Sequence, residues 1–151
     1  MGLPESLVSN LPRDRRIGID TPIFIYHFEK SNPFASLAGA ALLAVEHGEV
    51  TGVTSLVTLL EISVLPLRLG RPEIADAYET LIASIPNLTI AQIDRRIARI
   101  AAELRARYNL RVPDALQIAA CLSNGADTFL TNDRRLRVVS ELDVRILADF
   151  K

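Results

Sequence analysis

Ile17-Gly18-Ile19-Asp20-Thr21-Pro22-Ile23-Phe24 is the stretch of sequence that decides the predicted fold. Its first three residues are small or apolar and predict a short strand that ends at Asp20. Thr21-Pro22 then opens a helix, because proline is tolerated at the first helical position. Strands that pass directly into helices are typical of α/β proteins. In these proteins the end of such a strand is where functional residues gather.

The same alternation continues along the rest of the chain. Further strands are expected at residues 50–54, 88–90, 127–131 and 144–147, and helices at 21–28, 34–46, 56–69, 73–84, 94–108 and 112–123. This alternation predicts an α/β fold with a short, parallel or mostly parallel sheet that is flanked by helices on both faces. The crossovers between parallel strands are expected to be right-handed. The functional crevice of such a sheet lies at the carboxyl ends of its strands.

Length and composition indicate a single globular domain. The chain has 151 residues, of which 49% are hydrophobic and 23% are charged, and this profile fits a folded domain with a sizeable core. We assign residues 15–151 to this domain and residues 1–14 to an N-terminal extension, in which Leu3, Leu7 and Leu11 are spaced as in a short helix. We recognise no signal peptide and no membrane-spanning segment, so a soluble cytoplasmic protein is expected.

Charge and cysteine content limit the possible chemistry. The formal net charge is −1, whereas many nucleic-acid binders carry a strong positive excess. A contact with a polyanion must therefore come from a local basic patch, with metal ions offsetting the acids nearby. The chain has one cysteine, Cys121, which excludes an intrachain disulfide and a cysteine-based zinc site. We expect Cys121 to be a small buried hydrophobic residue.

Four acidic residues lie among apolar segments near strand ends or in helices: Asp20, Glu61, Asp114 and Asp133. Each has an ordinary structural explanation, as a helix cap, a first-turn acid or a solvent-facing side chain. Together they favour a functional cluster, because carboxylates that converge in one crevice are costly to bury unless a cation neutralises them. All-oxygen ligands suit Mg²⁺ or Mn²⁺ rather than Zn²⁺. A carboxylate cage around such ions indicates phosphoryl transfer.

Four motifs, taken in order, carry a resemblance to a known family: Ile-Gly-Ile-Asp20-Thr-Pro-Ile-Phe-Ile-Tyr, Val-Thr-Leu-Leu-Glu61-Ile, Pro-Asp114-Ala-Leu-Gln-Ile-Ala-Ala and Phe-Leu-Thr131-Asn-Asp133-Arg-Arg-Leu. They resemble PIN-domain ribonucleases, and in particular the VapC-type toxins of toxin–antitoxin pairs, from about residue 17 to 147. The resemblance implies a Rossmann-like three-layer fold, dependence on Mg²⁺ or Mn²⁺, and endonucleolytic hydrolysis of RNA. One departure is the Thr-Pro pair after Asp20, where the family often has threonine with asparagine or serine.

The resemblance also implies roles for the four acids, which fall on the family's catalytic positions. We assign Asp20 and Asp114 as the principal metal ligands and add Asp133 as a third. Glu61 is expected to bind metal through water or to orient the nucleophile.

Four further residues lie close to these acids in the sequence. Thr131 and Asn132 are expected to orient the metal ligands by contacting them, without binding the metal themselves. Arg111 and Arg134 would flank the crevice, where they are candidates for contacts to RNA phosphates.

Partners follow from the resemblance as well. VapC-type toxins are held inactive by a small antitoxin protein and commonly form homodimers, so an RNA substrate, a cognate antitoxin and a homodimer are expected. The apolar helices around residues 24–28 and 56–69 are candidates for the corresponding surfaces, although they can equally belong to the core.

Other functions were weighed against this hypothesis. A haloacid-dehalogenase-type phosphatase would have a second aspartate two residues after Asp20, where Pro22 stands. A receiver domain would have an acidic pair near its first strand and a lysine after its last strand, and neither is present. A catalytically degenerate PIN-like module that binds RNA or protein stays the alternative, although all four acids are intact.

Overall fold

The structure is a computed structural model that describes residues 15–150. The predicted N-terminal extension, residues 1–14, with its short leucine-spaced helix, lies outside the described residues. Among the described residues, no helix is both long enough and apolar enough to span a bilayer.

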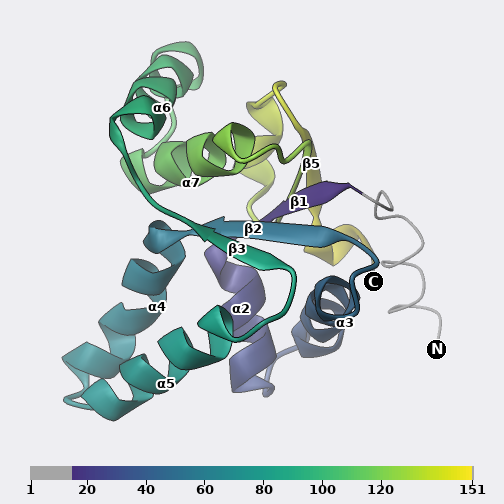
Figure 1. The fold of residues 1–151 in the computed structure, drawn as a ribbon, viewed down its shortest axis with the longest axis vertical. Helices are drawn as coiled ribbons and strands as arrows, with labels where there is room; N and C mark the ends of the chain where they lie inside the picture. The colour runs from purple at the N-terminus through teal and green to yellow at the C-terminus, as the bar shows by residue number, and fades with distance from the viewer. Residues whose placement is uncertain (1–14, 151) are drawn as a thin grey trace.

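A parallel sheet forms the centre of the described domain (Figure 1). Its five strands within residues 15–150 are β1 (Arg16–Ile19), β2 (Thr51–Ser55), β3 (Leu88–Ala91), β4 (Thr128–Thr131) and β5 (Asp143–Ile146), in the order β3-β2-β1-β4-β5. Every neighbouring pair is parallel. The predicted α/β class and all five predicted strands are confirmed, with boundaries shifted by at most one residue. The sheet is entirely parallel rather than mixed.

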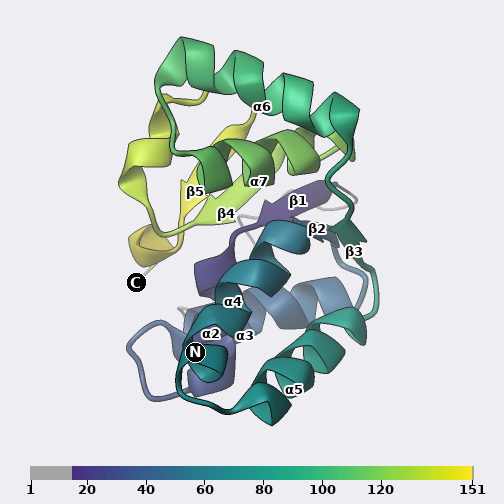
Figure 2. The same cartoon turned by 90° about the vertical axis from the view of Figure 1, so that its left-hand side faces the viewer.

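Helices cover both faces of the sheet, so the domain has three layers (Figure 2). One face carries α2 (Thr21–Glu29), α3 (Ala35–Glu46), α4 (Leu56–Arg68) and α5 (Pro72–Ala83), and the other carries α6 (Arg95–Tyr108) and α7 (Val112–Ser123). The 3₁₀ helices η1 (Arg134–Val138) and η2 (Leu147–Phe150) follow β4 and β5. Each helix predicted within residues 15–150 is therefore present, and the short turn expected after Asp133 is η1.

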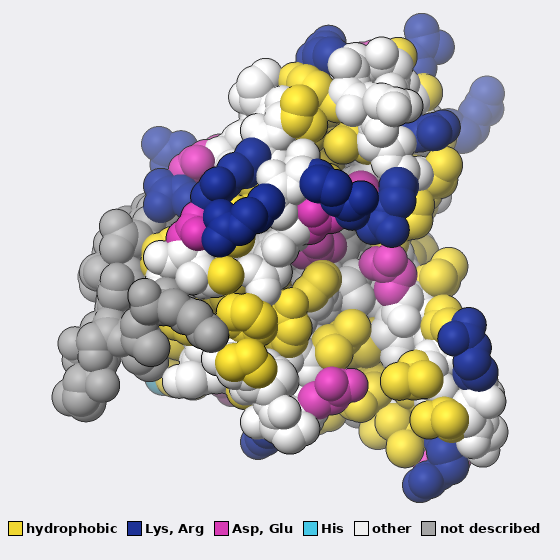
Figure 3. Space-filling model, turned by 180° about the vertical axis from the view of Figure 1, so that it is seen from behind, with side chains coloured by type: hydrophobic (Ala, Val, Ile, Leu, Met, Phe, Trp, Pro, Cys, Tyr) yellow, Lys and Arg dark blue, Asp and Glu magenta, His cyan; other side chains and the backbone are white. Residues whose placement is uncertain are grey.

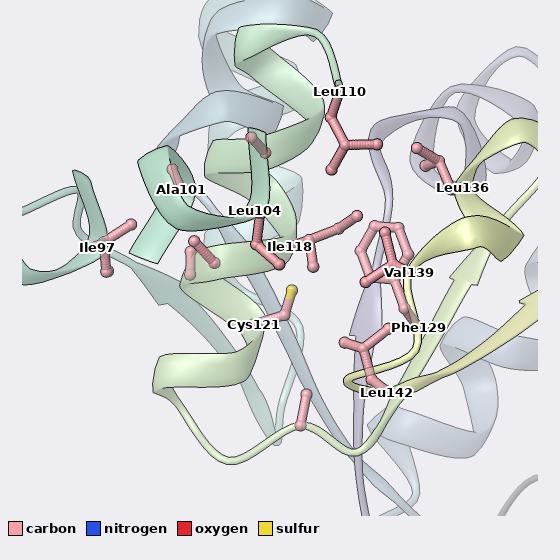
Figure 4. Packing of buried hydrophobic residues seen from close by; sticks show 14 of the residues in the cluster. Ile97, Ala101, Leu104, Leu110, Ile118, Cys121, Phe129, Leu136, Val139 and Leu142 are labelled. Carbon is pink, nitrogen blue, oxygen red and sulfur yellow. The ribbon is translucent and has the colours of Figure 1, made fainter. Parts of the chain in front are cut away.

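Two groups of buried side chains fill the spaces between these layers. One joins β1 to α2 and α3, and the other joins β2 and β4 to α6 and α7 (Figure 4). Both groups are aliphatic apart from a few rings such as Phe24 and Phe129, as the absence of tryptophan predicts. Cys121 is fully buried in the second group, which confirms the structural role expected for it.

Gly18, in the middle of β1, allows α7 to approach the sheet closely. A Cβ atom at this position would lie 2.7 Å from the Sγ of Cys121 and 2.8 Å from the Cδ1 of Phe129. Both distances are shorter than any ordinary carbon contact, and both neighbours are fully buried. The absence of a side chain at Gly18 thus fixes how closely α7 packs on the strand that ends at the candidate site.

Strand ends and helix starts place the predicted acids at one edge of the sheet. Asp20 follows β1 directly and caps α2, with φ −77° and ψ 156°. Asp133 lies two residues beyond β4 and caps η1. Because β1 and β4 are parallel neighbours, these two aspartates lie at the same carboxyl edge, as predicted. Glu61 lies within α4, and Asp114 lies in the first turn of α7.

Candidate active site

Asp20 is the buried centre of the candidate site. Its side chain is held on both oxygens: Oδ1 accepts a hydrogen bond from the backbone N–H of Thr21 at 2.9 Å, and Oδ2 accepts one from Oγ1 of Thr131 at 2.7 Å. Only 7% of the residue is exposed. Burial raises the pKa of Asp20 to about 6, although the two hydrogen bonds oppose this shift. The charges of Asp114 and Glu61 raise the pKa further, which shows that these acids repel Asp20.

Thr131 connects the ends of β1 and β4. Its hydroxyl donates to Asp20 and accepts a hydrogen bond from the backbone N–H of Asp133 at 3.1 Å. One fully buried threonine therefore fixes the positions of two candidate metal ligands. That Thr131 orients metal ligands stays a prediction.

Asn132 holds the same loop in a different way. Its Nδ2 donates to the phenol oxygen of Tyr26 at 3.2 Å, and its Oδ1 accepts from the backbone N–H of Ala148 at 3.0 Å. The side chain therefore ties the loop after β4 to α2 and η2. In these contacts Asn132 acts on the backbone that carries Asp133 rather than on a carboxylate.

Glu61 is exposed and lies on α4, whereas Asp20 lies at the start of α2. Thr21 joins the two, because its backbone N–H binds Asp20 while its Oγ1 donates to Oε1 of Glu61 at 2.7 Å. Sequence reasoning did not single out Thr21, although it follows the strand-ending aspartate directly. The Thr-Pro pair after Asp20 departs from the family's usual sequence. Its threonine nevertheless supplies a polar contact to Glu61.

Asp114 and Asp133 are each paired with an arginine. Nε of Arg111 lies 3.0 Å from Oδ2 of Asp114. Arg135 binds Asp133 with two nitrogens, Nε at 3.0 Å from Oδ1 and Nη2 at 2.6 Å from Oδ2. The hydrogen bonds and charge of Arg135 lower the pKa of Asp133, and Arg111 adds to the same effect.

Arg134, the second residue predicted to contact RNA phosphates, pairs with an aspartate outside the four predicted acids. Its Nη2 lies 2.7 Å from Oδ1 of Asp149 in η2. Arg135, its neighbour, is the arginine that reaches the site. Sequence reasoning grouped these two arginines together and could not separate them, because their directions depend on the 3₁₀ geometry of η1.

The four acids fit a hard divalent cation in the chemistry of their donor atoms. All their donors are carboxylate oxygens, the ligands that Mg²⁺ and Mn²⁺ prefer. A cation would offset the cost of burial that chiefly raises the pKa of Asp20, and the smaller repulsion from Asp114 and Glu61. Among residues 15–150, no group of three or more acidic, histidine or cysteine side chains is arranged so that it could hold a metal ion. Two of the predicted ligands, Asp114 and Asp133, contact arginines instead.

The surface around the site is divided between charge and hydrophobic side chains. Figure 3 shows acidic side chains between a band of basic side chains and an extensive hydrophobic surface. The hydrophobic part includes a groove between α2, α4 and α5, where Ile25, Ile62 and Tyr78 form part of the lining and Glu61 lies at the border. On α4, Leu65 also lines this groove and has 54% of its surface exposed.

The chain belongs to the PIN-domain family, whose model matches residues 17–142. No curated protein matches the chain in a sequence search. Solved structures with the same fold include VapBC2 from Rickettsia felis, bound to a DNA fragment from its promoter, with a TM-score of 0.69 and 17% identity over 87% of this chain and 98% of that one. FitAcB from Neisseria gonorrhoeae gives a TM-score of 0.65 and 18% identity over 87% and 98% of the two chains.

A third structure is VapC20 from Mycobacterium tuberculosis, a toxin that cleaves the sarcin–ricin loop. Its TM-score is 0.59, with 17% identity over 75% of this chain and 86% of that one. At these identities the similarity concerns the fold. It confirms the Rossmann-like three-layer PIN architecture that the four motifs predicted.

Proposed function

We propose that this protein is a Mg²⁺- or Mn²⁺-dependent endoribonuclease and the toxin of a VapBC-type toxin–antitoxin pair. The observation that carries the proposal is Asp20, a buried carboxylate whose pKa is raised to about 6, next to Asp114 and Glu61 at the carboxyl edge of a PIN-domain sheet. Carboxylates that repel each other at such a place are typical of sites that bind cations.

In the proposed mechanism Asp20 and Asp114 would hold the cation, with Asp133 as a third ligand. When bound there, the cation would supply a water molecule of lowered pKa and would neutralise charge on the scissile phosphate. Thr131 keeps Asp20 and the backbone of Asp133 in place. Glu61 orients the attacking water through its second oxygen, because Oε1 accepts from Thr21.

The arginines take a second role in this proposal. A cation at Asp114 and Asp133 competes with the guanidinium groups of Arg111 and Arg135 for the same oxygens. Once displaced, each guanidinium can bind a phosphate, for which its planar donors are suited. Arg134 stays a candidate for the same task if it leaves Asp149.

Cleavage of a mixed RNA pool by the purified protein tests the proposed activity. We expect cleavage with Mg²⁺ or Mn²⁺, and none after removal of the metal with EDTA. Cleavage that is undiminished in EDTA would contradict the metal-dependent mechanism. RNA that is bound but never cut in either metal would support the alternative, a catalytically degenerate PIN-like module. Sequencing the 5′ ends of the products then identifies which RNA is cut.

Replacing Arg135 with glutamine should increase the affinity for Mn²⁺ in the absence of RNA. The pair with Asp133 is exposed and screened by water, so we expect a modest gain of roughly two- to five-fold. Binding is measured as the loss of the free Mn²⁺ signal in electron paramagnetic resonance.

Arg137→Gln is the matched control for this experiment. It removes the same charge from the same 3₁₀ helix, but Arg137 pairs with Asp149 and not with the site. Equal gains in the two variants would mean that only the net charge matters, and would contradict direct competition at Asp133.

We also propose a small antitoxin as the partner of the hydrophobic groove. The proposal is supported by solved structures of the same fold that are toxin–antitoxin complexes, and by the exposed apolar residues of α4 beside the site. The homodimer and the cytoplasmic location implied by the family stay predictions.

A further inference from the structure

A chain of buried polar side chains runs through the interior behind the candidate site. Its members come from α2, β2, α4 and α7, and each is at most 3% exposed: Thr21, Thr54, Ser55, Thr58 and Gln117. The chain ends at Glu61, on the surface. Buried hydroxyl and amide groups lose the hydrogen bonds of water and must bind each other instead, so their geometry is closely restricted.

The contacts of this chain are short and continuous. Oγ of Ser55 donates to Oε1 of Gln117, and Nε2 of Gln117 lies 2.7 Å from Oγ1 of Thr58. Oγ1 of Thr58 lies 3.1 Å from Oγ1 of Thr21, which in turn lies 2.7 Å from Oε1 of Glu61. A side branch leads from Thr58 to Thr54 at 2.7 Å, and from Thr54 to the carbonyl of Ile19 at 2.9 Å.

The direction of the hydrogen bonds follows from the groups at the ends. A carbonyl and an ionised carboxylate can only accept, so Thr54 donates to Ile19 and Thr21 donates to Glu61. The single hydroxyl proton of Thr58 can serve only one of the oxygens of Thr21 and Thr54 at a time, and donation to Thr21 is the hydrogen bond that continues the chain to Glu61. Thr58 also accepts a hydrogen bond from the amide N–H of Gln117. Ser55 fixes the orientation of this amide, because it donates to the opposite, oxygen end.

From this arrangement we infer that Gln117 and Thr58 are positioning residues for Glu61, which they hold through the hydroxyl of Thr21. Neither residue hydrogen-bonds to one of the predicted metal ligands. They act by directing the hydroxyl of Thr21 toward one carboxylate oxygen of Glu61. The other oxygen of Glu61 takes no part in this hydrogen-bond chain. The inference rests on the proposed function only in the task that it gives to Glu61. The hydrogen-bond chain itself is a property of the metal-free protein.

The metal-free protein provides the first test, by nuclear magnetic resonance of the Glu61 side-chain carboxyl carbon. Thr58→Val has nearly the same shape but no hydroxyl, and it should shift this resonance. Thr58→Ser keeps the hydroxyl and should leave the resonance close to its original position. Gln117→Met should shift it as Thr58→Val does, whereas Gln92→Met, the same change at an exposed glutamine in the sequence, should not.

One measurement needs no variant. In the unaltered protein the hydroxyl protons of Thr21 and Thr58 should exchange slowly with water, and that of Thr58 should show a magnetisation transfer to the side-chain amide of Gln117. Fast exchange of both hydroxyls, or an unchanged Glu61 resonance in both folded variants Thr58→Val and Gln117→Met, would overturn the inference. These outcomes do not depend on whether the protein cuts RNA.

Kinetics provide the second test where the protein is active. Thr58→Val and Gln117→Met should lower kcat about tenfold, the lower end of the range for partners that orient a site residue. KM for RNA should stay unchanged, because neither residue reaches the surface. Thr58→Ser should restore kcat and Gln92→Met should leave it unaffected. A rise of KM with an unchanged kcat would contradict a positioning role for Glu61.

Discussion

Replacing Asp20 with asparagine is expected to abolish metal-dependent RNA cleavage and, without metal, to stabilise the fold at neutral pH. The side chain keeps its shape, but the negative charge that would hold the cation is lost, and the amide nitrogen cannot accept one of the two hydrogen bonds from Thr21 and Thr131. Cleavage should fall by roughly a thousandfold or more, as for other groups that stabilise charge directly in the reaction. Undiminished cleavage by Asp20→Asn would remove the site from consideration.

The gain in stability follows from the sign of the pKa shift. Folding raises the pKa of Asp20 from an ordinary 3.8 to about 6, so the folded state binds this proton more tightly than the unfolded state does. The stability that the folded state gains from binding this proton is therefore lost as pH rises through 6. A shift of about two units corresponds to roughly 3 kcal/mol above pH 6, and asparagine avoids most of this cost.

Urea unfolding in EDTA measures this difference. The asparagine variant should be more stable than the unaltered protein at about pH 7.5, and the advantage should shrink as pH falls from 6 toward 3.8, because Asp20 becomes protonated in the folded state over this range. Added Mn²⁺ should then stabilise the unaltered protein but not the variant. An advantage that is independent of pH would contradict the raised pKa.

Asp127→Asn provides the matched control for both measurements. Asp127 lies at the opposite, amino end of β4 and pairs with Arg15. Its replacement removes the same charge far along the strand from Asp20, so cleavage and the response to Mn²⁺ should be retained.

Replacing Gly18 with valine is expected to prevent stable folding. The first side-chain atom would already lie 2.7 Å from Cys121 and 2.8 Å from Phe129, and two further methyl groups have no space between β1 and α7. Overpacking of this kind costs at least roughly 3 kcal/mol where backbone on both sides must move. The loss of the cooperative urea transition, or of soluble protein, is the measurement.

The smaller change Gly18→Ala allows the cause to be checked. It should destabilise the protein by roughly 1 to 3 kcal/mol, and Cys121→Ala should relieve part of this cost when the two are combined, because it removes the sulfur atom. Gly39→Ala, in α3, is the control: its Cβ would meet His27 no closer than 3.4 Å, and alanine favours a helix. Equal losses at Gly18 and Gly39 would contradict the packing argument.

The sequence predicted the fold and the neighbourhood of the site because both depend on order along the chain. Alternating apolar strands and helices require a parallel sheet, and Asp20 and Asp133 follow two of those strands. The order of strands and helices does not show which side chains from different elements contact one another. Thr58 and Gln117 are single polar residues within apolar runs, and Thr21 follows Asp20 at the start of a helix. Each alone resembles a cap or a surface residue.

The ion-pair partners of the arginines could not be predicted from the sequence either. Arg134 and Arg135 are neighbours with the same charge, and only the turn of η1 decides that Arg135 reaches Asp133 while Arg134 reaches Asp149. Pattern and charge predict a basic rim, but the direction of each long side chain depends on three-dimensional contacts. The ion pairs on Asp114 and Asp133 were therefore not predicted.

The strand order has a consequence for how the chain folds. β1 is the first strand in sequence and the central strand in space, and its contact from Asp20 to Thr131 spans 111 residues. Until β4 joins, one side of β1 is an unpaired edge, which is the kind of edge that other chains can pair with. Such long-range pairing is slow, because a large loop must close first. We therefore expect a late folding step, in which β4 docks on β1 and closes the sheet.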